Sequence, residues 1–573
     1  MKDRIPHVVL AAAHFLPGPD AVPLGAASVA SALKAAFRRR NRGPAIRVSL
    51  AECVVSEGAP VLVERILHDK PDFAGFSLYV WNRDLMVKAA RILRSSLPGI
   101  FLFCGGPEAG ALPAGLSLNQ GGPFDAVLPG EGEDAAVRLF RKLLENNGKA
   151  LLSLSPIEGG ILQSHPPQLA SLPSPWLDGT LKPRGREGVL WELGRGCPFG
   201  CIYCAESKGA GKETAGTKQV RYFSDDRIQQ ELRLFIREKI PYVFVLDPTF
   251  NLDAKRAKAV LDTIIREVET SGSRASNTRW HFEVRAELID RGQAARFARL
   301  GASLQIGLQT ADPRIAALIG RGFNRKRFEA GIGLVNEAGI SFGLDLIYGL
   351  PGDSLDGYRK SLDYTLSLYP DNLDLFRLAV LPGTVLAERA GRWGLRRQDK
   401  APYEVIETPD FSASDIEQAE RISAALELFY NRGRAVAWFN QILRPLRLKP
   451  SAFLEKFARF LRRRSPGPQT EAYTTSLDTA PVIKLQLEFL EYCYVRARKE
   501  RLIKAVRDIV SFHGAWGRAL AEGLETETAF TYKPELVCGR EGMDIERFEQ
   551  AYKPDPGEYR MICREGRPEL RRI

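Results

Sequence analysis

The chain has 573 residues, enough for three or four domains, which excludes a single small binding module. Hydrophobic residues make up 45% and charged residues 26% of the chain, the mix of a globular protein, so large-scale disorder is not expected. The formal net charge of +12 allows an acidic partner or nucleic acid, although a solvated basic face is the commoner source of such a surplus.

Two further features concern the cellular compartment and membrane association. Eight cysteines are far too few for a disulfide scaffold, so we expect a reducing cytoplasm. No run of 18 or more apolar residues occurs, so no transmembrane helix and no membrane partner are predicted. The apolar stretch near the N-terminus lacks a small-residue cleavage site, and we interpret it as a buried strand, not a signal peptide.

Residues 1–145 alternate short apolar runs with helical patterns. The predicted strands are 7–13, 45–55, 73–80, 100–104 and 125–128, and the predicted helices are 25–37, 60–69, 84–97 and 133–145. This alternation predicts a doubly wound, Rossmann-like parallel sheet, in which a ligand binds at the carboxyl ends of the strands.

Three glycine-bearing segments lie in or just after these strands. They are Gly75-Phe76-Ser77, Gly105-Gly106-Pro107-Glu108 and Gly130-Glu131-Gly132-Glu133. Each alone is explained by a turn, but together they favour a cofactor site, because glycine lets the backbone approach a ligand closely.

A Ser- and Pro-rich stretch, 146–186, predicts a linker to a second alternating region over 187–400. Its predicted strands are 189–193, 242–246, 280–284, 304–308, 341–347 and 372–378. Six strands with intervening helices suggest an open (β/α)6 barrel of the TIM type, with reactive groups at the strand carboxyl ends. Residues 401–573 form a mostly helical domain without clear strands, with helical patterns over 414–431 and 483–509.

Three cysteines with the spacing Cys-x₃-Cys-x₂-Cys follow the first barrel strand directly. Cys197, Cys201 and Cys204 could bind three irons of a four-iron cluster and leave the fourth iron open. The alternative is a zinc site, which needs four ligands. The nearest histidines, His165 and His281, do not have zinc spacing, so the pattern favours iron and sulfur.

This spacing, with Tyr203 before the last cysteine, resembles the radical S-adenosylmethionine (radical SAM) superfamily. The resemblance implies that the three cysteines bind a [4Fe–4S] cluster. It further implies that SAM binds the open iron and is cleaved reductively to methionine and a 5′-deoxyadenosyl radical.

Further barrel positions are similar to those of oxygen-independent coproporphyrinogen dehydrogenases. In that family the residues matching Gln309 and Asp345 contact the SAM ribose, and those matching Glu283 and Arg321 lie at the SAM site. Asp247 stands where family members hold the methionine amino group, although it departs from the common Gly-Gly-Glu motif. Each residue alone could instead be a structural ion pair or cap.

The N-terminal part resembles the cobalamin-binding domain of class B radical SAM enzymes. The resemblance rests on residues 72–82 and on the two later glycine turns, and it implies cobalamin contacts at Ser77, Gly105, Gly106, Gly130 and Gly132. The Asp-x-His-x-x-Gly cobalt-ligand motif is absent, and only His14 remains of it. We therefore expect cobalamin without a protein histidine on cobalt.

The resemblance implies a cobalamin-dependent radical SAM enzyme that abstracts hydrogen from an unactivated carbon and transfers a methyl group from methylcobalamin. A small-molecule or peptide substrate and an external electron donor such as flavodoxin or ferredoxin are expected, and no nucleic acid. Three alternatives remain: a radical SAM enzyme without cobalamin, which could catalyse rearrangement or cyclisation; an RNA-modifying enzyme using the C-terminal arginines; and a non-enzymatic zinc-binding protein.

Overall fold

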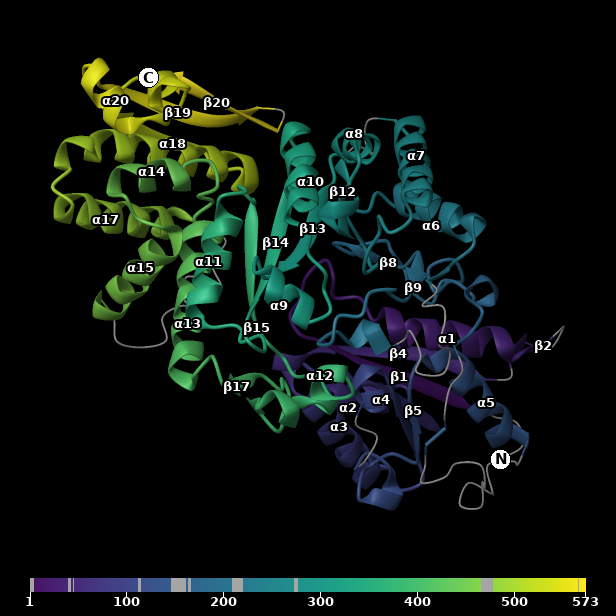
Figure 1. Cartoon of the computed structure of the whole chain (residues 1–573). Coiled ribbons are helices and arrows are strands. Elements are labelled where there is room, and N and C mark those ends of the chain that lie inside the picture. The colour runs from purple at the N-terminus through teal and green to yellow at the C-terminus, as the bar shows by residue number, and fades with distance from the viewer. Residues whose placement is uncertain are drawn as a thin grey trace. The chain divides into compact units, whose positions relative to one another are not determined.

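The computed structural model describes residues 5–39, 43–44, 46–111, 115–145, 161–162, 166–208, 220–272, 277–464, 478–564 and 566–573. The chain forms two compact units, drawn together in Figure 1. The first comprises residues 1–304 and 379–405, and the second comprises 305–378 and 406–573. One boundary falls within strand β13 (Ser303–Gln309).

The first unit opens with the predicted five-stranded parallel sheet, in the order β4-β1-β5-β6-β7. Its strands are β1 (His7–His14), β4 (Arg47–Val54), β5 (Phe73–Ser77), β6 (Phe101–Gly105) and β7 (Ala126–Leu128). Strand β1 is buried along its whole length except at His14, as expected for a central strand covered on both faces. The doubly wound prediction is confirmed.

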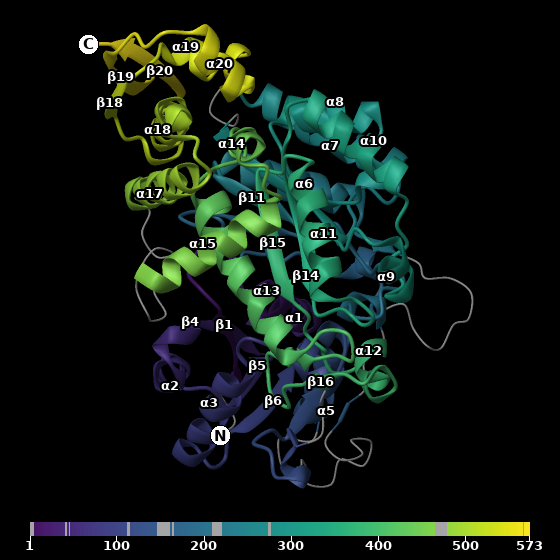
Figure 2. The ribbon, with the colours of Figure 1, turned by 60° about the vertical axis from the view of Figure 1, so that its left-hand side comes forward.

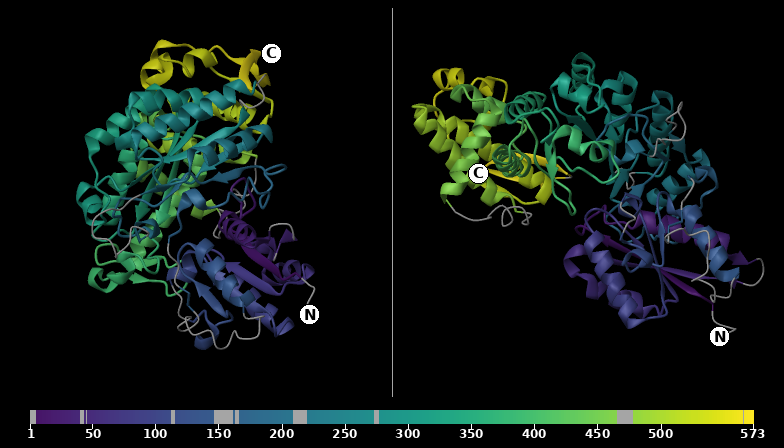
Figure 3. Two further views of the ribbon diagram at one scale, coloured as in Figure 1. Left: turned by 90° about the vertical axis from the view of Figure 1, so that its right-hand side faces the viewer. Right: turned by 60° about the horizontal axis from the view of Figure 1, so that its bottom comes forward.

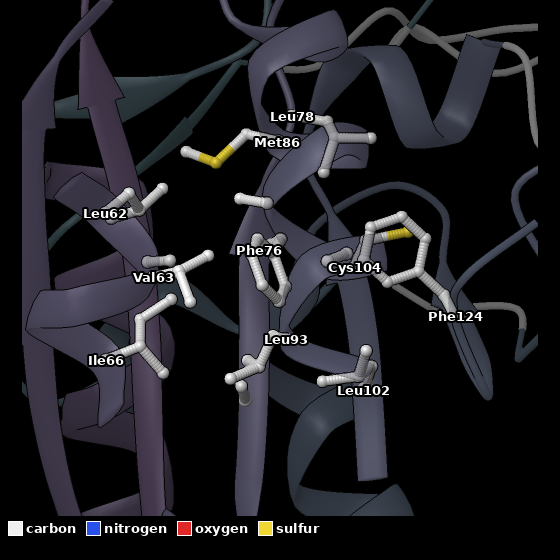
Figure 4. Close-up of a cluster of buried hydrophobic side chains, with 14 of the residues drawn as sticks. Leu62, Val63, Ile66, Phe76, Leu78, Met86, Leu93, Leu102, Cys104 and Phe124 are labelled. Atoms are coloured by element: carbon white, nitrogen blue, oxygen red, sulfur yellow. The ribbon is translucent and has the colours of Figure 1, made fainter. Parts of the chain in front are cut away.

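Helices cover both faces of this sheet, as Figure 3 shows. Helices α1 (Leu24–Ala36) and α5 (Gly132–Glu145) pack on one face, and α2 (Ala59–His68) and α3 (Arg83–Ser96) pack on the other. Figure 4 shows the second of these layers, where Leu62, Leu93 and Phe76 are at most 2% exposed. Burying one such side chain stabilises the fold by roughly 1.5–3 kcal/mol. Short elements complete this part: β2 (Arg38–Arg39), β3 (Gly43–Pro44) and α4 (Pro107–Ala111).

The rest of the first unit contains the first half of the predicted barrel. Strands β8 (Val189–Trp191), β11 (Tyr242–Val245) and β12 (Arg279–Val284) are parallel neighbours in that order. Helices α6 (Asp225–Arg237), α7 (Ala254–Thr270) and α8 (Arg291–Leu300) alternate with them, and the fully buried Trp191 packs edge-on against Phe235 of α6. Smaller elements are β9 (Gly194–Arg195), β10 (Arg221–Tyr222), α12 (Val385–Glu388), β16 (Arg396–Arg397) and β17 (Val405–Glu407).

The second unit contains the remaining barrel strands, β14 (Ser341–Tyr348) and β15 (Asn372–Arg377), which follow β13 in the sheet. All six predicted strands are present, each within two residues of its predicted ends. Helices α9 (Pro313–Leu318), α10 (Arg325–Glu337) and α11 (Leu355–Leu366) alternate with them. Figure 2 shows α11 beside β14 and α13 (Ala413–Leu426) beside β15.

The C-terminal part of the second unit is mainly helical, as predicted. A π-helical turn, Glu427–Arg432, follows α13 and places Phe429 among Phe453, Phe457 and Phe489, with ring centroids 5.0–6.2 Å apart. The helices are α14 (Phe439–Leu446), α15 (Pro450–Arg464), α17 (Ala480–Arg496), α18 (Ile503–Glu522), α19 (Pro534–Val537) and α20 (Ile545–Ala551).

Two predictions for this part are wrong. Strands β18 (Thr526–Phe530), β19 (Gly557–Arg564) and β20 (Arg567–Arg572) form an antiparallel sheet where no strand was expected. Their sequences are rich in charge because mainly one face is covered, by Ala515 and Ala519 of α18 against Met561. The single helical stretch predicted over 483–509 is two helices, because Arg498 adopts a left-handed conformation with φ of 54° between them.

Residues 146–160 and 163–165 of the predicted linker lie outside the described residues. Its later part packs into the first unit: Trp176 is 3% exposed, and the Ser174 hydroxyl donates to Glu231 of α6. No described helix has both the length and the apolar character needed to cross a membrane.

Candidate cofactor site

The three predicted cluster ligands lie on the loop that follows β9. All three are free thiols; Cys201 is buried, and Cys197 and Cys204 are half-buried. Burial raises the pKa of Cys197 and Cys204, while backbone N–H groups of Phe199, Glu206 and Ser207 donate to their sulfurs and oppose that rise. The same donors would stabilise thiolates that bind iron, so this donor set suits a cluster.

The zinc alternative gains no support. Among the described residues, no three His, Cys, Asp or Glu side chains converge as ligands of one metal ion would. The His281 ring nitrogen Nδ1 instead lies 2.8 Å from the Ser303 hydroxyl, and His165 lies outside the described residues.

Asp247 lies two residues after the end of β11 and is 5% exposed. Its Oδ1 accepts hydrogen bonds from the backbone N–H groups of Leu193 and Gly194, both at 3.0 Å. Burial raises its pKa to about 6. Asp247 therefore holds the start of the cysteine loop, and it also lines a small cavity with Gly196 and Thr249.

Glu283 lies one residue before the end of β12 and shares a strand face with His281. Its backbone carbonyl accepts from Phe250, which follows Asp247 in the next loop, so β12 is tied to the Asp247 loop.

The predicted cobalamin residues lie at the carboxyl edge of the N-terminal sheet. Ser77 and Gly105 end adjacent strands and pair in register, and Gly130 and Gly132 follow β7 and begin α5. Gly106 has a φ of 97°, and a Cβ there would lie 2.6 Å from the Leu78 carbonyl oxygen, so only glycine fits.

Apolar side chains are unusually exposed at this edge. Phe15 and Leu16, just after β1, are 64% and 63% exposed, and Trp81, after β5, is 43% exposed. Trp81 stacks on Tyr79 with ring centroids 4.4 Å apart, and its indole N–H donates to the Ala13 carbonyl. Exposed apolar side chains at the carboxyl edge of a parallel sheet suit a ligand with apolar surface.

His14 ends β1, and its Nε2 lies 3.2 Å from a carboxylate oxygen of Glu52 on β4. Arg186 approaches the other oxygen of Glu52 at 3.4 Å. The structure thus places His14 at a strand end with a carboxylate partner, although the predicted motif lacks its aspartate.

Arg195 connects this edge to the cysteine loop. It lies two residues before Cys197. Its guanidinium forms ion pairs with Glu131 of the loop after β7, at 2.7 Å, and with Glu133 of the first turn of α5, at 2.8 Å. A third ion pair, at 2.9 Å, joins it to Glu192. The N-terminal sheet and the cysteine loop therefore meet through a partly buried ionic network within the first unit.

The remaining predicted SAM residues lie in the second unit and gather around Gly307 of β13. A Cβ on Gly307 would collide with the Gln309 amide and lie within 3.6 Å of Arg321 and Asp345, so glycine makes room for all three. Gln309 has a φ of 70°, a strained conformation for a residue at a strand end. Its Oε1 is buried without a hydrogen-bond partner among the described residues, as expected of an acceptor awaiting a ligand hydroxyl.

Sequence reasoning missed the neighbours that hold Asp345. Gln305 of β13 donates to Asp345 and to Asp374 of β15, the latter at 3.0 Å, and Asp345 and Asp374 are register partners. Burial raises the pKa of Asp345 to about 6. The only signal was the presence of polar residues on β13 and β15, the two strands that flank β14, and the sequence of one strand does not distinguish them from ordinary alternation.

The C-terminal arginines considered for RNA binding are partly engaged. Arg464 pairs with Glu488, and Lys499 pairs with Glu546 at 2.6 Å. Arg462 lines a shallow cavity of about 220 Å³ with Arg421 and Arg459.

Three family models match the chain. Residues 15–140 match the B12 binding domain, residues 191–365 match the radical SAM superfamily, and residues 391–474 match a protein of unknown function, DUF4080. The chain combines a B12-binding domain with a radical SAM domain. The predicted class B radical SAM architecture is confirmed, and so is the presence of an uncharacterised C-terminal region.

Curated relatives share this architecture. The chain is 27% identical over 387 residues to the cobalamin-dependent radical SAM methyltransferase TokK of Streptomyces tokunonensis. It is 25% identical over 391 residues to the 2-(S-pantetheinyl)-carbapenam-3-carboxylate methyltransferase of Streptantibioticus cattleyicolor. Each match covers 62% of this chain and 54% of the relative, so the chain spans about half the length of these relatives. The hopanoid C-3 methylase of Methylococcus capsulatus is 28% identical, over 46% of this chain and 52% of its own.

Solved structures show the same fold. TsrM from Kitasatospora setae, with cobalamin and a [4Fe–4S] cluster bound, matches with a TM-score of 0.53 and 17% identity over 72% of this chain and 84% of its own. OxsB, with aqua-cobalamin and SAM bound, matches with a TM-score of 0.56 and 13% identity over 88% of this chain and 81% of its own. The radical SAM domain implies a [4Fe–4S] cluster and SAM, and the B12-binding domain implies cobalamin.

Proposed function

We propose that this protein is a cobalamin-dependent radical SAM enzyme that transfers a methyl group to an unactivated carbon. One observation carries the proposal: Arg195, beside the cysteine loop, is ion-paired with Glu131 and Glu133 at the cobalamin edge of the N-terminal sheet. A cofactor that carries a methyl group and a cofactor that generates a radical would bind on neighbouring loops. The relatives named as methyltransferases support the same reaction class.

Cys197, Cys201 and Cys204 would hold the cluster, and the three backbone N–H donors to their sulfurs would stabilise its charge. Cys201 is the one buried thiol of the three, so water and oxygen have least access to its sulfur. The Leu386 N–H donates to the Ile202 carbonyl at 2.8 Å, which holds the middle of the loop in place.

When bound, the cluster and SAM would supply a 5′-deoxyadenosyl radical, and cobalamin would supply the methyl group. The residues that we propose for SAM binding are Asp247, Glu283, Gln309, Arg321 and Asp345. Their carboxylate, amide and guanidinium groups match an ammonium, ribose hydroxyls and a carboxylate. Phe15, Leu16 and Trp81 would contact the corrin, and Ser77, Gly105, Gly106, Gly130 and Gly132 would let the backbone approach it.

The proposal includes the cellular setting. All eight cysteines are free, which supports a reducing cytoplasm, and radical generation requires an external one-electron donor such as flavodoxin or ferredoxin. We propose a small-molecule or peptide substrate. The proposed domain limits are 1–145 for cobalamin binding, 146–186 for a linker, 187–400 for the radical SAM core and 401–573 for the C-terminal domain.

The test uses protein reconstituted without oxygen, with cobalamin, iron, sulfide, SAM and a reductant supplied. We expect bound cobalamin in the visible spectrum and 5′-deoxyadenosine by chromatography. The variant Cys201→Ala should lose 5′-deoxyadenosine formation, whereas Cys563→Ala, which removes an exposed cysteine of β19, should retain it. Production of 5′-deoxyadenosine without bound cobalamin would favour the cobalamin-free alternative. If the protein neither binds cobalamin nor forms 5′-deoxyadenosine, the proposal is overturned.

A further inference from the structure

Arg195 uses all three guanidinium nitrogens on carboxylates. Nε lies 2.9 Å from Glu192, Nη1 lies 2.7 Å from Glu131, and Nη2 lies 2.8 Å from Glu133. The side chain is only 16% exposed, so these contacts are poorly screened by solvent. A planar guanidinium held at three points fixes its partners in direction as well as in distance.

Two of these three acids, Glu131 and Glu133, belong to the segment that we propose contacts cobalamin. Glu131 stands between Gly130 and Gly132, and Glu133 lies in the first turn of α5, with its side chain 5% exposed. Arg221, directly opposite Arg195 in the β9–β10 pair, also contacts Glu131. The loop from Gly130 to Glu133 is thus attached to the strand that leads into the cysteine loop.

Stability alone is a poor explanation for this network. Burying an ion pair often costs as much in desolvation as it returns, and well-packed apolar side chains commonly stabilise a fold as well or better. Precise placement is a better explanation, because misplacing reacting groups by about 1 Å can cost on the order of 100-fold in rate.

We propose that Arg195 is a positioning residue that fixes the cobalamin-side loop 130–133 relative to the three-cysteine loop, acting through Glu131 and Glu133. This inference rests on the proposed function, because it concerns the spacing of the two cofactors bound there. Arg195 itself touches neither substrate nor the reacting atoms in this account.

The test compares wild type with Arg195→Met, both loaded with cob(II)alamin and a reduced cluster. Pulsed electron paramagnetic resonance (EPR) measures the distance distribution between the two paramagnets, and hydrogen exchange measures opening of residues 130–133. We expect a clearly broader distribution and about tenfold faster exchange in the loop, since loss of a buried charge pair favours local opening. The control is Arg227→Met, which removes a buried arginine paired with Glu231 over the same Phe223 ring and should change neither readout.

A second variant keeps the test decisive if Arg195→Met fails to assemble a cluster. Glu133→Gln removes one partner on the cobalamin side and leaves the cysteine loop unchanged, and it should broaden the distribution in the same way. Suppose that wild-type protein binds both cofactors and that Glu133→Gln shows the same distance distribution and the same exchange. This result would overturn the positioning role and leave the proposed function intact. Wild-type protein that binds no cobalamin would instead overturn the proposed function.

Discussion

At Asp247, one carboxylate oxygen accepts from two backbone N–H groups at the start of the cysteine loop, while burial holds its pKa at about 6. The structure shows one task of this side chain, capping the loop, and we propose a second, presenting charge to the amino group of SAM. Capping needs only an acceptor, whereas binding an ammonium favours a negative charge.

Substitutions of Asp247 should separate these tasks. Asp247→Ala leaves two buried N–H groups without their acceptor, so we expect a loss of about 3 kcal/mol in the free energy of unfolding. Asp247→Asn retains an acceptor, so it should stay within about 1 kcal/mol of wild type but bind SAM about tenfold more weakly. Urea titration and calorimetry measure the two effects. Wild-type SAM affinity in Asp247→Asn would restrict this residue to capping.

His14→Ala should leave the spectrum of bound cobalamin unchanged. The His14 Nε2 is engaged by Glu52, so it is not available to cobalt. The EPR spectrum of the cob(II)alamin form should lack nitrogen splitting from a protein ligand in both proteins. Splitting that is present in wild type and lost in the variant would show histidine on cobalt.

How far these residues could be predicted depended on where their partners lie. Cys197, Cys201 and Cys204 lie within eight consecutive positions of one loop, so their spacing could be recognised in the sequence. Arg195 acts with acids more than 60 residues earlier, and its role became visible only in the structure. Gln305 and Asp374 were missed for the same reason, since they lie on β13 and β15 and meet across the intervening strand β14.

At the scale of elements, the parallel strands were predictable because a strand that is buried on both faces has a continuous apolar sequence, as β1 does. The β18–β19–β20 sheet was not, because its exposed face carries charges that resemble a surface loop or helix. Asp508 of α18 ties this sheet to the helices: it is 1% exposed and accepts from the backbone N–H groups of Thr531 and Tyr532.

Asp508→Ala should therefore destabilise the C-terminal sheet. Two N–H groups lose their buried acceptor, at a cost of about 3 kcal/mol, whereas Asp508→Asn should cost about 1 kcal/mol or less. Hydrogen exchange of residues 526–530 is the measurement. Equal exchange in both variants would contradict the role of the carboxylate oxygen as the shared acceptor.

At the scale of the molecule, one compact unit contains the N-terminal sheet and the cysteine loop, and the second contains Gln309, Arg321 and Asp345. The sequence indicated the two βα regions but not this division, because compactness depends on packing between distant segments. Residues 379–405 show this: Tyr403 donates to the buried Glu108 of the N-terminal part at 2.8 Å.

Loading cobalamin and the cluster, without SAM, should protect the first unit selectively. Binding to the folded form alone stabilises the segments that contact the ligand. We expect slower hydrogen exchange in residues 77–82, 105–108, 130–133 and 194–204 and no change in α17 and α18. Equal protection of α17 and α18 would contradict this localisation.

The most direct test is Mössbauer spectroscopy of wild-type protein reconstituted without oxygen with ⁵⁷Fe, recorded with and without SAM. We expect a four-iron cubane in which SAM changes the signal of one iron and leaves the signals of the other three unchanged. No cubane, or four iron sites that SAM leaves unaltered, would contradict it.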